Sequence, residues 1–397
     1  MRSASHIVLY TEAPVQGGVT AIVELLAKEL NAVTPLTLVH SPNPALSSWV
    51  RSVQCSRTVA AALGHTGSLP GWLMPGRVRQ LLLVFNAARL VHFHLHTPFA
   101  CAAAIALARF AGVPRIVATE HYIAQLPFLR RRRLVAPMAA LREVRIAASL
   151  AIKRWSLRGI DDVVTLSNGN RSVFESFAGP RARPIVHVIH NGIDLHQFDA
   201  GPADEHKHPL HPGCGHLLVT TVAGLNNQKG HVYLIRAIPD ILRAVPHARF
   251  LFVGDGHLRG DLEAMAASLG IARAVTFAGE RPDVPLILAS SDLVVLPSLF
   301  EGMPMSVLEA MAAGRAVVAT DVAGTQDVVV SGQTGLLVPP EDPEALAGAI
   351  VELLLDAEKR QAFGRNGRRH VEQNFSAALM GERYRALFRE TGMPGRP

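Results

Sequence analysis

The feature that most constrains this chain is a repeated alternation of short apolar runs with segments of helical periodicity. Runs such as HIVLY and RIVATE are rich in β-branched residues, are too short for helices, and are too apolar for exposed strands. This alternation is typical of parallel sheets whose two faces are buried under crossover helices. We therefore predict an α/β protein with doubly wound, Rossmann-like sheets. The expected strands lie near 6–10, 36–40, 89–95, 115–120, 162–166, 185–190, 217–223, 249–254, 274–278, 292–297, 316–320 and 335–338, and the expected helices near 18–30, 98–111, 137–158 and 169–177 and from Pro343 onward.

The 397 residues are too many for one ordinary core, so more than one domain is expected. Residues 201–215, GPADEHKHPLHPGCG, are polar, rich in proline and glycine, and without periodicity, which indicates a linker. The predicted domains are residues 1–200 and 216–375. Because doubly wound sheets bind ligands at the carboxyl ends of their strands, we expect a site in a central cleft that both domains face.

Composition excludes several classes of protein. A content of 49% hydrophobic and 18% charged residues describes a folded globular chain. No apolar run is long enough to span a bilayer, and the start, MRSASHIVLY, is better explained by a first strand than by a signal peptide. The cysteines, Cys55, Cys101 and Cys214, are far apart and odd in number, which fits a reducing compartment. We expect a cytoplasmic protein.

The net charge of +7 is concentrated in residues 128–158, where basic and apolar side chains interleave and the only acid is Glu143. Such a stretch can lie on an anionic membrane surface, which would make the protein peripheral on the inner face of the membrane. The alternative is an ordinary solvated helix face. Nucleic acid is not expected as a partner because no recognition module accompanies the charge. The basic residues are Arg130, Arg131, Arg132, Arg133, Arg142, Arg145, Lys153, Arg154 and Arg158.

Two glutamates stand eight residues apart in FEGMPMSVLEAMAAG. Pro304 can open a helix and Gly314 can end it, which places Glu309 inside the helix and Glu301 in the loop before its N-terminus. Amides at a helix start attract phosphate, and carboxylates bind sugar hydroxyls. The segment is therefore predicted to bind a phosphorylated sugar.

This segment resembles the Glu-x7-Glu motif of retaining GT-B glycosyltransferases, in particular glycosyltransferase family 4. Further stretches match that family in order over nearly the whole chain. They are Gly17-Gly18 after HIVLY, HLHTP, ATEH ending at His121, VVTLSN with Ser167, VIHNGID with Asn191-Gly192, LNNQKG with Lys229, FVGDG with Gly254 and Gly256, and SGQTGLLVPPED.

The resemblance implies a GT-B fold in which the final helix, within 376–397, crosses back onto the N-terminal domain. It implies that His121 and Glu301 line the transferred sugar, that Lys229 contacts the diphosphate, and that Glu309 contacts the ribose. The implied donor-binding set is Gly17, Gly18, Lys229, Gly254, Gly302, Met303, Pro304 and Glu309. The alternatives are an ordinary surface lysine, a solvent-facing glutamate, and a histidine that only ends its strand.

The implied reaction moves a hexose or N-acetylhexosamine from a UDP- or GDP-linked donor to a glycan or lipid-linked acceptor, with retention. The nucleotide sugar is a substrate, and no cofactor is expected. A metal is not expected either, because no Asp-x-Asp run lies near the proposed site. Two histidine clusters leave a metal site as a minor alternative: His92, His94 and His96 on one strand face, and His206, His208, His211, Cys214 and His216 in and beside the linker.

The chain departs from the family pattern where an arginine usually precedes the asparagine-rich turn, because Gly224 stands there. One of two cations expected on the diphosphate is then missing, and Arg281 could compensate for it. Asp327 replaces a glutamate, which is a milder change. Two alternative functions remain open: a non-catalytic nucleotide-sugar-binding partner and a nucleotide-sugar epimerase. A dehydrogenase is disfavoured because the Gly17-Gly18 loop lacks the Gly-x-Gly-x-x-Gly spacing.

Overall fold

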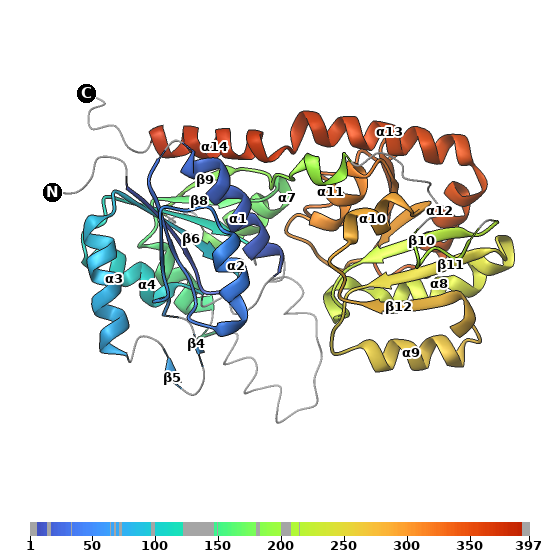
Figure 1. Ribbon diagram of the computed structural model, residues 1–397, viewed down its shortest axis with the longest axis horizontal. Coiled ribbons are helices and arrows are strands. Elements are labelled where there is room, and N and C mark those ends of the chain that lie inside the picture. Colours follow the sequence, from blue (N-terminus) through green and yellow to red (C-terminus); the bar gives the residue numbers. More distant parts are fainter. Residues whose placement is uncertain are drawn as a thin grey trace. The chain divides into compact units, whose positions relative to one another are not determined.

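The computed structural model describes residues 6–13, 17–32, 34–63, 65–66, 69–70, 74–96, 100–121, 147–148, 150–179, 183–199, 208–213 and 215–390. The chain divides into two compact units (Figure 1). The first consists of Met1–Gly192 together with Ala377–Pro397, and the second of Ile193–Ser376. Each unit contains its own sheet and its own apolar core.

The first unit is built on a seven-stranded parallel sheet whose order reverses between β1 and β6. The strands on both sides of this switch point are almost fully buried, and apart from His92 and His94 of β6 they are mostly apolar, as expected for strands covered on both faces. In spatial order they are β3 (Arg57–Val59), β2 (Leu36–Val39), β1 (Ile7–Thr11), β6 (Leu90–Leu95), β7 (Arg115–Glu120), β8 (Asp162–Thr165) and β9 (Ile185–Val188).

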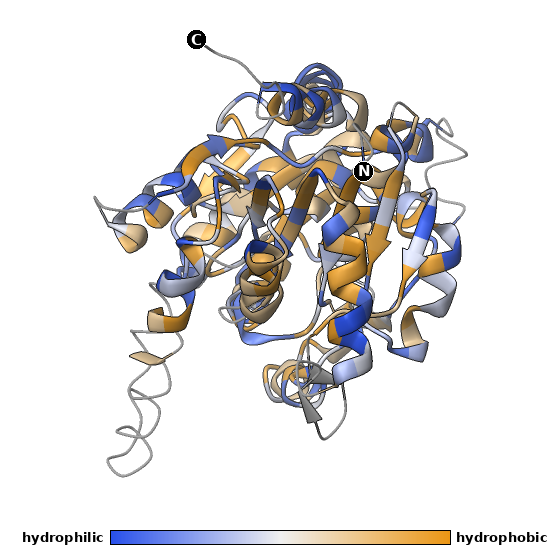
Figure 2. Cartoon of the chain, turned by 90° about the vertical axis from the view of Figure 1, so that its left-hand side faces the viewer, coloured by the Kyte–Doolittle hydropathy of each residue, from blue (hydrophilic) through white to orange (hydrophobic). Residues whose placement is uncertain are grey.

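Helices cover both faces of this sheet. One face, with Tyr10 and Phe93, packs against α3 (Pro75–Ala87), α4 (Ala102–Phe110) and α7 (Asn168–Ala178). The other face lies under α1 (Gly18–Asn31) and α14 (Ala377–Glu390), and there His92 contacts Tyr384 and Phe388 of α14. In Figure 2 the strands are mostly orange and the helices mix orange with blue, as expected for strands buried on both faces and helices with one buried face. Further short elements among the described residues of this unit are η1 (Pro44–Leu46), α2 (Ser47–Ser52), β4 (His65–Thr66) and β5 (Leu69–Pro70).

The second unit has a six-stranded parallel sheet whose order reverses between β10 and β13. Its strands, in spatial order, are β12 (Val275–Gly279), β11 (Ala248–Val253), β10 (Leu217–Val222), β13 (Leu293–Leu296), β14 (Ala316–Thr320) and β15 (Gly335–Val338). Its helical elements are η4 (Leu195–Phe198), η5 (Asn227–Lys229), α8 (His231–Ala244), α9 (Arg259–Ser268), η6 (Ala272–Ala274), α10 (Val284–Ala289), α11 (Met305–Ala312), α12 (Pro343–Leu355) and α13 (Ala357–Asn374).

The prediction of two doubly wound α/β sheets is confirmed, and every predicted strand is present. Three details differ. The helix expected over 98–111 is the shorter α4, and the described residues after Pro343 form three helices. The elements that were not predicted in the first unit are η1, α2, β3, β4, β5 and α3. The helix expected over 137–158 is described at 147–148 and 150–157, where it is helical, and residues 137–146 and 149 lie outside the described residues.

Candidate active site

The loops after β10 and β13 flank the switch point of the second unit, the place where doubly wound sheets bind ligands. Hydrogen bonds join the two loops through Gln228. Its carbonyl oxygen accepts from the Leu299 amide (2.7 Å), and its Nε2 donates to the Phe300 carbonyl oxygen (3.0 Å). Asn226 starts η5 because its side chain accepts from the Gln228 amide (3.0 Å). The chain after β10 is therefore fixed against the chain after β13.

Gly230 lets these loops approach closely. Its φ is 63°, and a Cβ at this position would lie 2.0 Å from the Pro297 carbonyl oxygen. Only glycine fits this conformation and this contact without strain. The preceding residue, Lys229, is thereby held beside the loop after β13.

Lys229 and Glu301 meet in this place. The Lys229 ammonium donates to Oε1 of Glu301 (2.6 Å), and the Ser298 hydroxyl donates to the same oxygen (2.7 Å). The Ser298 carbonyl oxygen in turn accepts from Thr320 Oγ1 (2.5 Å). Glu301 is buried, whereas the Lys229 side chain is 21% exposed and has two further hydrogens to donate. The pair can bind an anion through the lysine and a hydroxyl through the carboxylate.

Helix α11 follows this loop. It runs from Met305 to Ala312 after Pro304 and ends before Gly314, as predicted. Gly302, Met303 and Pro304 form the turn between Glu301 and the helix, and Met303 packs inside the protein. Glu309 is half-buried among apolar neighbours, and this burial raises the pKa of its carboxyl to about 7. When this carboxyl is ionised, a ligand that donates hydrogen bonds to it stabilises the carboxylate.

Gly254 has a packing role. With a φ of 129°, it lies so close to the loop after β10 that a Cβ would be 2.3 Å from the Ala223 carbonyl oxygen. Its amide donates to the carbonyl oxygen of Gly279 (2.8 Å). The need for glycine at 254 is thus explained by the contact between loops. Its predicted role in donor binding stays a prediction.

Gly224, where the resemblance leads us to expect an arginine, lies in a place that a Cβ could occupy with ordinary van der Waals contacts. The nearest atoms to a Cβ built on Gly224 are Asn226 Nδ2 at 3.5 Å and the Asp255 carbonyl oxygen at 3.6 Å. The proposed substitute, Arg281, donates through Nε and Nη2 to both carboxylate oxygens of Asp283, at 2.9 and 2.6 Å. His208 binds the same carboxylate at 3.1 Å. Arg281 is therefore committed to a local ion pair, and the structure adds no support to its role as the second cation.

Gly17 and Gly18 lie at the start of α1 in the first unit. The Thr20 hydroxyl accepts from the Gly17 amide (2.7 Å) and donates to the Gly17 carbonyl oxygen (2.8 Å). A Cβ on either glycine would meet no described atom within 4 Å. Packing among the described residues therefore does not require glycine here, and close approach of a ligand to the helix start remains the better explanation.

His121 follows β7 directly and is partly exposed. Its Nε2 lies 3.2 Å from Nδ1 of His94 on the neighbouring strand β6. Burial, followed by the nearby His96, lowers the pKa of His121 to about 3. The imidazole is therefore neutral near pH 7 and can exchange hydrogen bonds with a hydroxyl.

The two histidines of β6, His92 and His94, are buried in the first unit. His92 binds Thr119 Oγ1 through Nε2 (2.7 Å), and that hydroxyl also contacts the Tyr384 hydroxyl (2.8 Å). Across the described ranges of the chain, no group of three histidine, cysteine, aspartate or glutamate side chains is placed to hold a metal ion. Two members of the linker cluster, His206 and Cys214, lie outside those ranges.

Sequence reasoning missed two features. One is Ser298, whose position three residues before Glu301 in PSLFE is a usable signal. The other is a buried ion pair between Glu120, which precedes His121, and Lys153. Lys153 is 2% exposed, so counting it among the residues that could face a membrane was wrong. Its neighbour Arg154 lies over the Phe177 ring, 5.0 Å from the centroid. Arg130 to Arg133, Arg142 and Arg145 lie outside the described residues.

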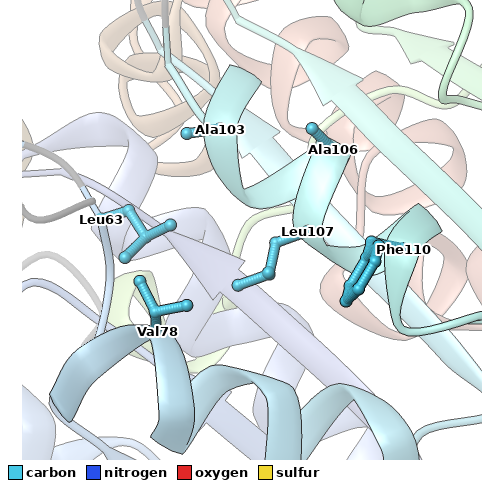
Figure 3. A pocket seen from close by; sticks show the side chains of 6 residues that line it. All are labelled: Leu63, Val78, Ala103, Ala106, Leu107 and Phe110. Carbon is cyan, nitrogen blue, oxygen red and sulfur yellow. The ribbon is translucent and has the colours of Figure 1, made fainter. Parts of the chain in front are cut away.

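An open apolar groove of about 400 Å³ lies between α3 and α4, apart from these polar residues (Figure 3). It offers no charged side chain for a phosphate or a sugar hydroxyl. Within the ranges described, no helix combines the length and the apolarity needed to cross a membrane. The groove is lined by Leu63, Val78, Ala103, Ala106, Leu107 and Phe110.

Comparison with known proteins identifies the family. Residues 16–197 match the model described as Glycosyltransferase Family 4, and residues 216–356 the model described as Glycosyl transferases group 1. The chain is 31% identical over 249 residues to a lipopolysaccharide core biosynthesis mannosyltransferase of Rhizobium leguminosarum bv. viciae, covering 60% of this chain and 68% of that protein. It is 29% identical over 394 residues to a GDP-mannose-dependent alpha-(1-6)-phosphatidylinositol monomannoside mannosyltransferase of Mycolicibacterium smegmatis, covering 94% and 95%.

Among solved structures, the chain is similar to Anabaena HepE in complex with UDP and glucose. The TM-score is 0.80 at 22% identity, over 97% of this chain and 99% of that one. At this identity the likeness shows the fold, which is of the GT-B type. Taken with the family models, these findings show that the chain belongs to glycosyltransferase family 4 and is a glycosyltransferase of GT-B fold.

Proposed function

We propose that this glycosyltransferase moves a hexose or an N-acetylhexosamine from a UDP- or GDP-linked donor to a glycan or lipid-linked acceptor, with retention at the anomeric carbon. The observation that carries the proposal is the contact between Lys229 and Glu301 at the switch point of the second unit (2.6 Å). Transfer from a nucleotide sugar needs a cation for the leaving diphosphate and acceptors for the sugar hydroxyls. This pair supplies one of each.

The remaining donor contacts follow from the same loops. Lys229 keeps hydrogens available for a pyrophosphate oxygen, and the amides before α11 add positive potential. Burial raises the pKa of Glu309 to about 7. Hydrogen bonds donated by the two hydroxyls of a ribose would favour its ionised form. His121 and Glu301 would contact the transferred sugar. In this scheme Gly17, Gly18, Gly302, Met303 and Pro304 supply close backbone approach.

Two relatives support an acceptor that carries a lipid, whereas another, a 2-deoxystreptamine glucosyltransferase of Streptomyces kanamyceticus, is named for an acceptor without one. The Mycolicibacterium relative is named for a phosphatidylinositol monomannoside and the Rhizobium relative for a lipopolysaccharide core. Part of residues 128–158 adds support for a peripheral position on the inner face of the membrane, because Ile152 and Trp155 are 41% and 54% exposed beside Arg158. Salt-sensitive pelleting with phosphatidylglycerol vesicles, reduced in Trp155→Ser, tests this point. No pelleting at low salt would contradict it.

Release of UDP or GDP with candidate acceptors tests the site. We expect Lys229→Ala and Glu309→Ala to lose activity while Lys229→Arg, which keeps a cation, retains part of it. Lys359→Ala is the matched control, because Lys359 also pairs with a glutamate (Glu352, 2.5 Å) but on the exposed side of α13. Thermal unfolding confirms that each variant is folded. Full activity in both alanine variants would remove the assignment of the site, and the anomer of the product, read by NMR, decides retention.

One observation favours a second function, a nucleotide-sugar-binding partner without turnover. Gly224 removes one cation, and Arg281 is committed to Asp283. Calorimetry that detects donor binding to a protein that releases no nucleotide with any acceptor or with water would establish this alternative.

A further inference from the structure

His94 and His121 form a pair inside the first unit. They lie on the neighbouring strands β6 and β7, their rings are nearly parallel at 23°, and Nδ1 of His94 is 3.2 Å from Nε2 of His121. A hydrogen bond between two imidazoles needs one donor and one acceptor, so the proton positions on the two rings depend on each other. His94 is fully buried, whereas His121 is only partly covered.

The second nitrogen of His94 decides between the two arrangements. Its Nε2 is buried and has no hydrogen-bond partner among the described residues. If His94 carries its proton on Nδ1, this nitrogen is a bare lone pair. If His94 carries its proton on Nε2, an N–H is buried without an acceptor. Among backbone groups, orphaned N–H donors are rarer than unsatisfied acceptors, and a buried donor left unsatisfied carries the full cost of its desolvation. We expect the same order for this imidazole, which favours the proton on Nδ1.

The surroundings keep His94 in this orientation. The ring of His92 lies 4.4 Å from that of His94 and is itself fixed by Thr119 and Tyr384. The charged forms are also disfavoured. Burial lowers the pKa of His94 well below its ordinary value, and the neighbouring His92, His121 and His96 lower it further. Both rings of the pair are therefore neutral near pH 7, and each carries a single proton.

We propose that His94 is a positioning residue that donates from Nδ1 to Nε2 of His121 and so fixes His121 as the tautomer protonated on Nδ1. Nδ1 of His121, the nitrogen that does not face His94, then carries an N–H that it can donate to a ligand. His121 donates a hydrogen bond to a sugar hydroxyl oxygen, and it does not remove a proton from the acceptor through this nitrogen. The statement about the sugar rests on the proposed function, whereas the tautomer itself does not.

Nitrogen NMR of protein labelled with ¹⁵N-histidine tests the tautomer directly, because protonated and bare ring nitrogens resonate far apart. His121→Gln assigns the signals of His121 by difference. In the native protein we expect Nδ1 of His121 to be protonated and Nε2 to be bare, with the same pattern for His94. A native His121 protonated on Nε2 would overturn the inference, and this measurement needs no variant at position 94.

Variants add a test of cause. His94→Phe keeps a ring of similar size but removes the donor, so we expect the fixed pattern of His121 to give way to exchange between tautomers. His92→Phe is the matched control on the same face of β6 and should leave the His121 pattern in place. An unchanged His121 pattern in His94→Phe would also overturn the inference.

Kinetics separate this inference from the proposed function. Loss of one oriented hydrogen bond to the sugar should lower kcat/KM about tenfold in His94→Phe. His94→Asn, which returns an amide N–H near the position of Nδ1, should recover part of this loss. If the NMR pattern is as expected but His121→Gln transfers sugar at the native rate, the role of His121 in the proposed function fails and the tautomer assignment stands.

Discussion

Glu309→Gln should make this protein more stable and less active, and the two effects have one cause. In the native protein, burial raises the pKa of the Glu309 carboxyl from 4.5 to about 7. The folded state therefore holds a proton between these pH values that the unfolded state releases. The stabilising contribution of this group is complete below pH 4.5 and is lost as the pH rises through 7. Glutamine has no proton to lose, so the variant avoids this loss.

The magnitude follows from the two pKa values. At about 1.4 kcal/mol for each pH unit, a rise from 4.5 to about 7 corresponds to about 3 kcal/mol of unfolding free energy above pH 8. For a domain of the size of the second unit, this is a rise in Tm of roughly 6 to 12 °C. Below pH 4.5 the two proteins should be equally stable. Loss of a charged acceptor for the ribose should lower kcat/KM by roughly 10- to 100-fold.

Scanning calorimetry from pH 4 to 9, paired with donor turnover, measures both effects. Glu352→Gln is the matched control because its carboxylate is 47% exposed in an ion pair on the surface, where such pairs contribute little. A Tm difference that does not grow with pH would refute the argument from burial. Lower stability in Glu309→Gln at pH 8 would show that the carboxylate is stabilised by a partner within the protein.

Three further predictions concern single contacts. A Cβ at position 224 would make only ordinary van der Waals contacts, so the site can accept a side chain. Gly224→Arg should therefore raise nucleotide release several-fold by restoring the second cation. Unchanged turnover would show that the diphosphate charge is balanced elsewhere. Gly230→Ala should lower Tm and raise KM for the donor, because a Cβ would lie 2.0 Å from a carbonyl oxygen of the facing loop. The control Gly348→Ala, on the exposed side of α12, should raise Tm slightly. Equal changes of Tm in the two variants would contradict the close contact between the loops. Lys153→Met should lower the free energy of unfolding by roughly 3–5 kcal/mol, because it leaves the Glu120 carboxylate buried without the lysine. Adding Glu120→Gln should recover most of this loss. Calorimetry that shows no loss of stability in the single variant would exclude a buried charge pair.

The sequence predicts the sheets well because their strands are buried on both faces. A strand such as β14, AVVAT, is entirely apolar or β-branched, so its signal does not depend on register. β3, an edge strand of three residues that are exposed or partly exposed, carries no such pattern. The break between α12 and α13 has a local cause that could have been read: the Asp356 side chain accepts from the Lys359 amide and starts a new helix.

The site is only partly predictable, because it depends on which strands become neighbours. Lys229 and Glu301 can be placed at the carboxyl ends of two strands from the sequence alone. Their contact across 72 residues requires β10 to lie beside β13, and this order is a property of the whole sheet. Lys153 shows the converse. The sequence does not distinguish it from the other basic residues of the same run. Its burial is explained by its ion pair with Glu120, which the sequence does not reveal.

The motif glycines, which sequence reasoning treats as one class, have two physical roles. At Gly230 and Gly254 a Cβ would collide with a carbonyl oxygen of an adjacent loop, so glycine is needed to let the loops touch. At Gly17 and Gly18 no described atom would be met, so the reason for glycine lies outside the packing of these residues. Glycines of the first kind determine where Lys229 is held, and they act on the donor through rigidity of the loops. Substitution at 254 should therefore lower stability and activity together. Substitution at 17 should change the affinity for the donor at constant Tm. A lower Tm after substitution at 17 would show that Gly17, too, is needed for packing.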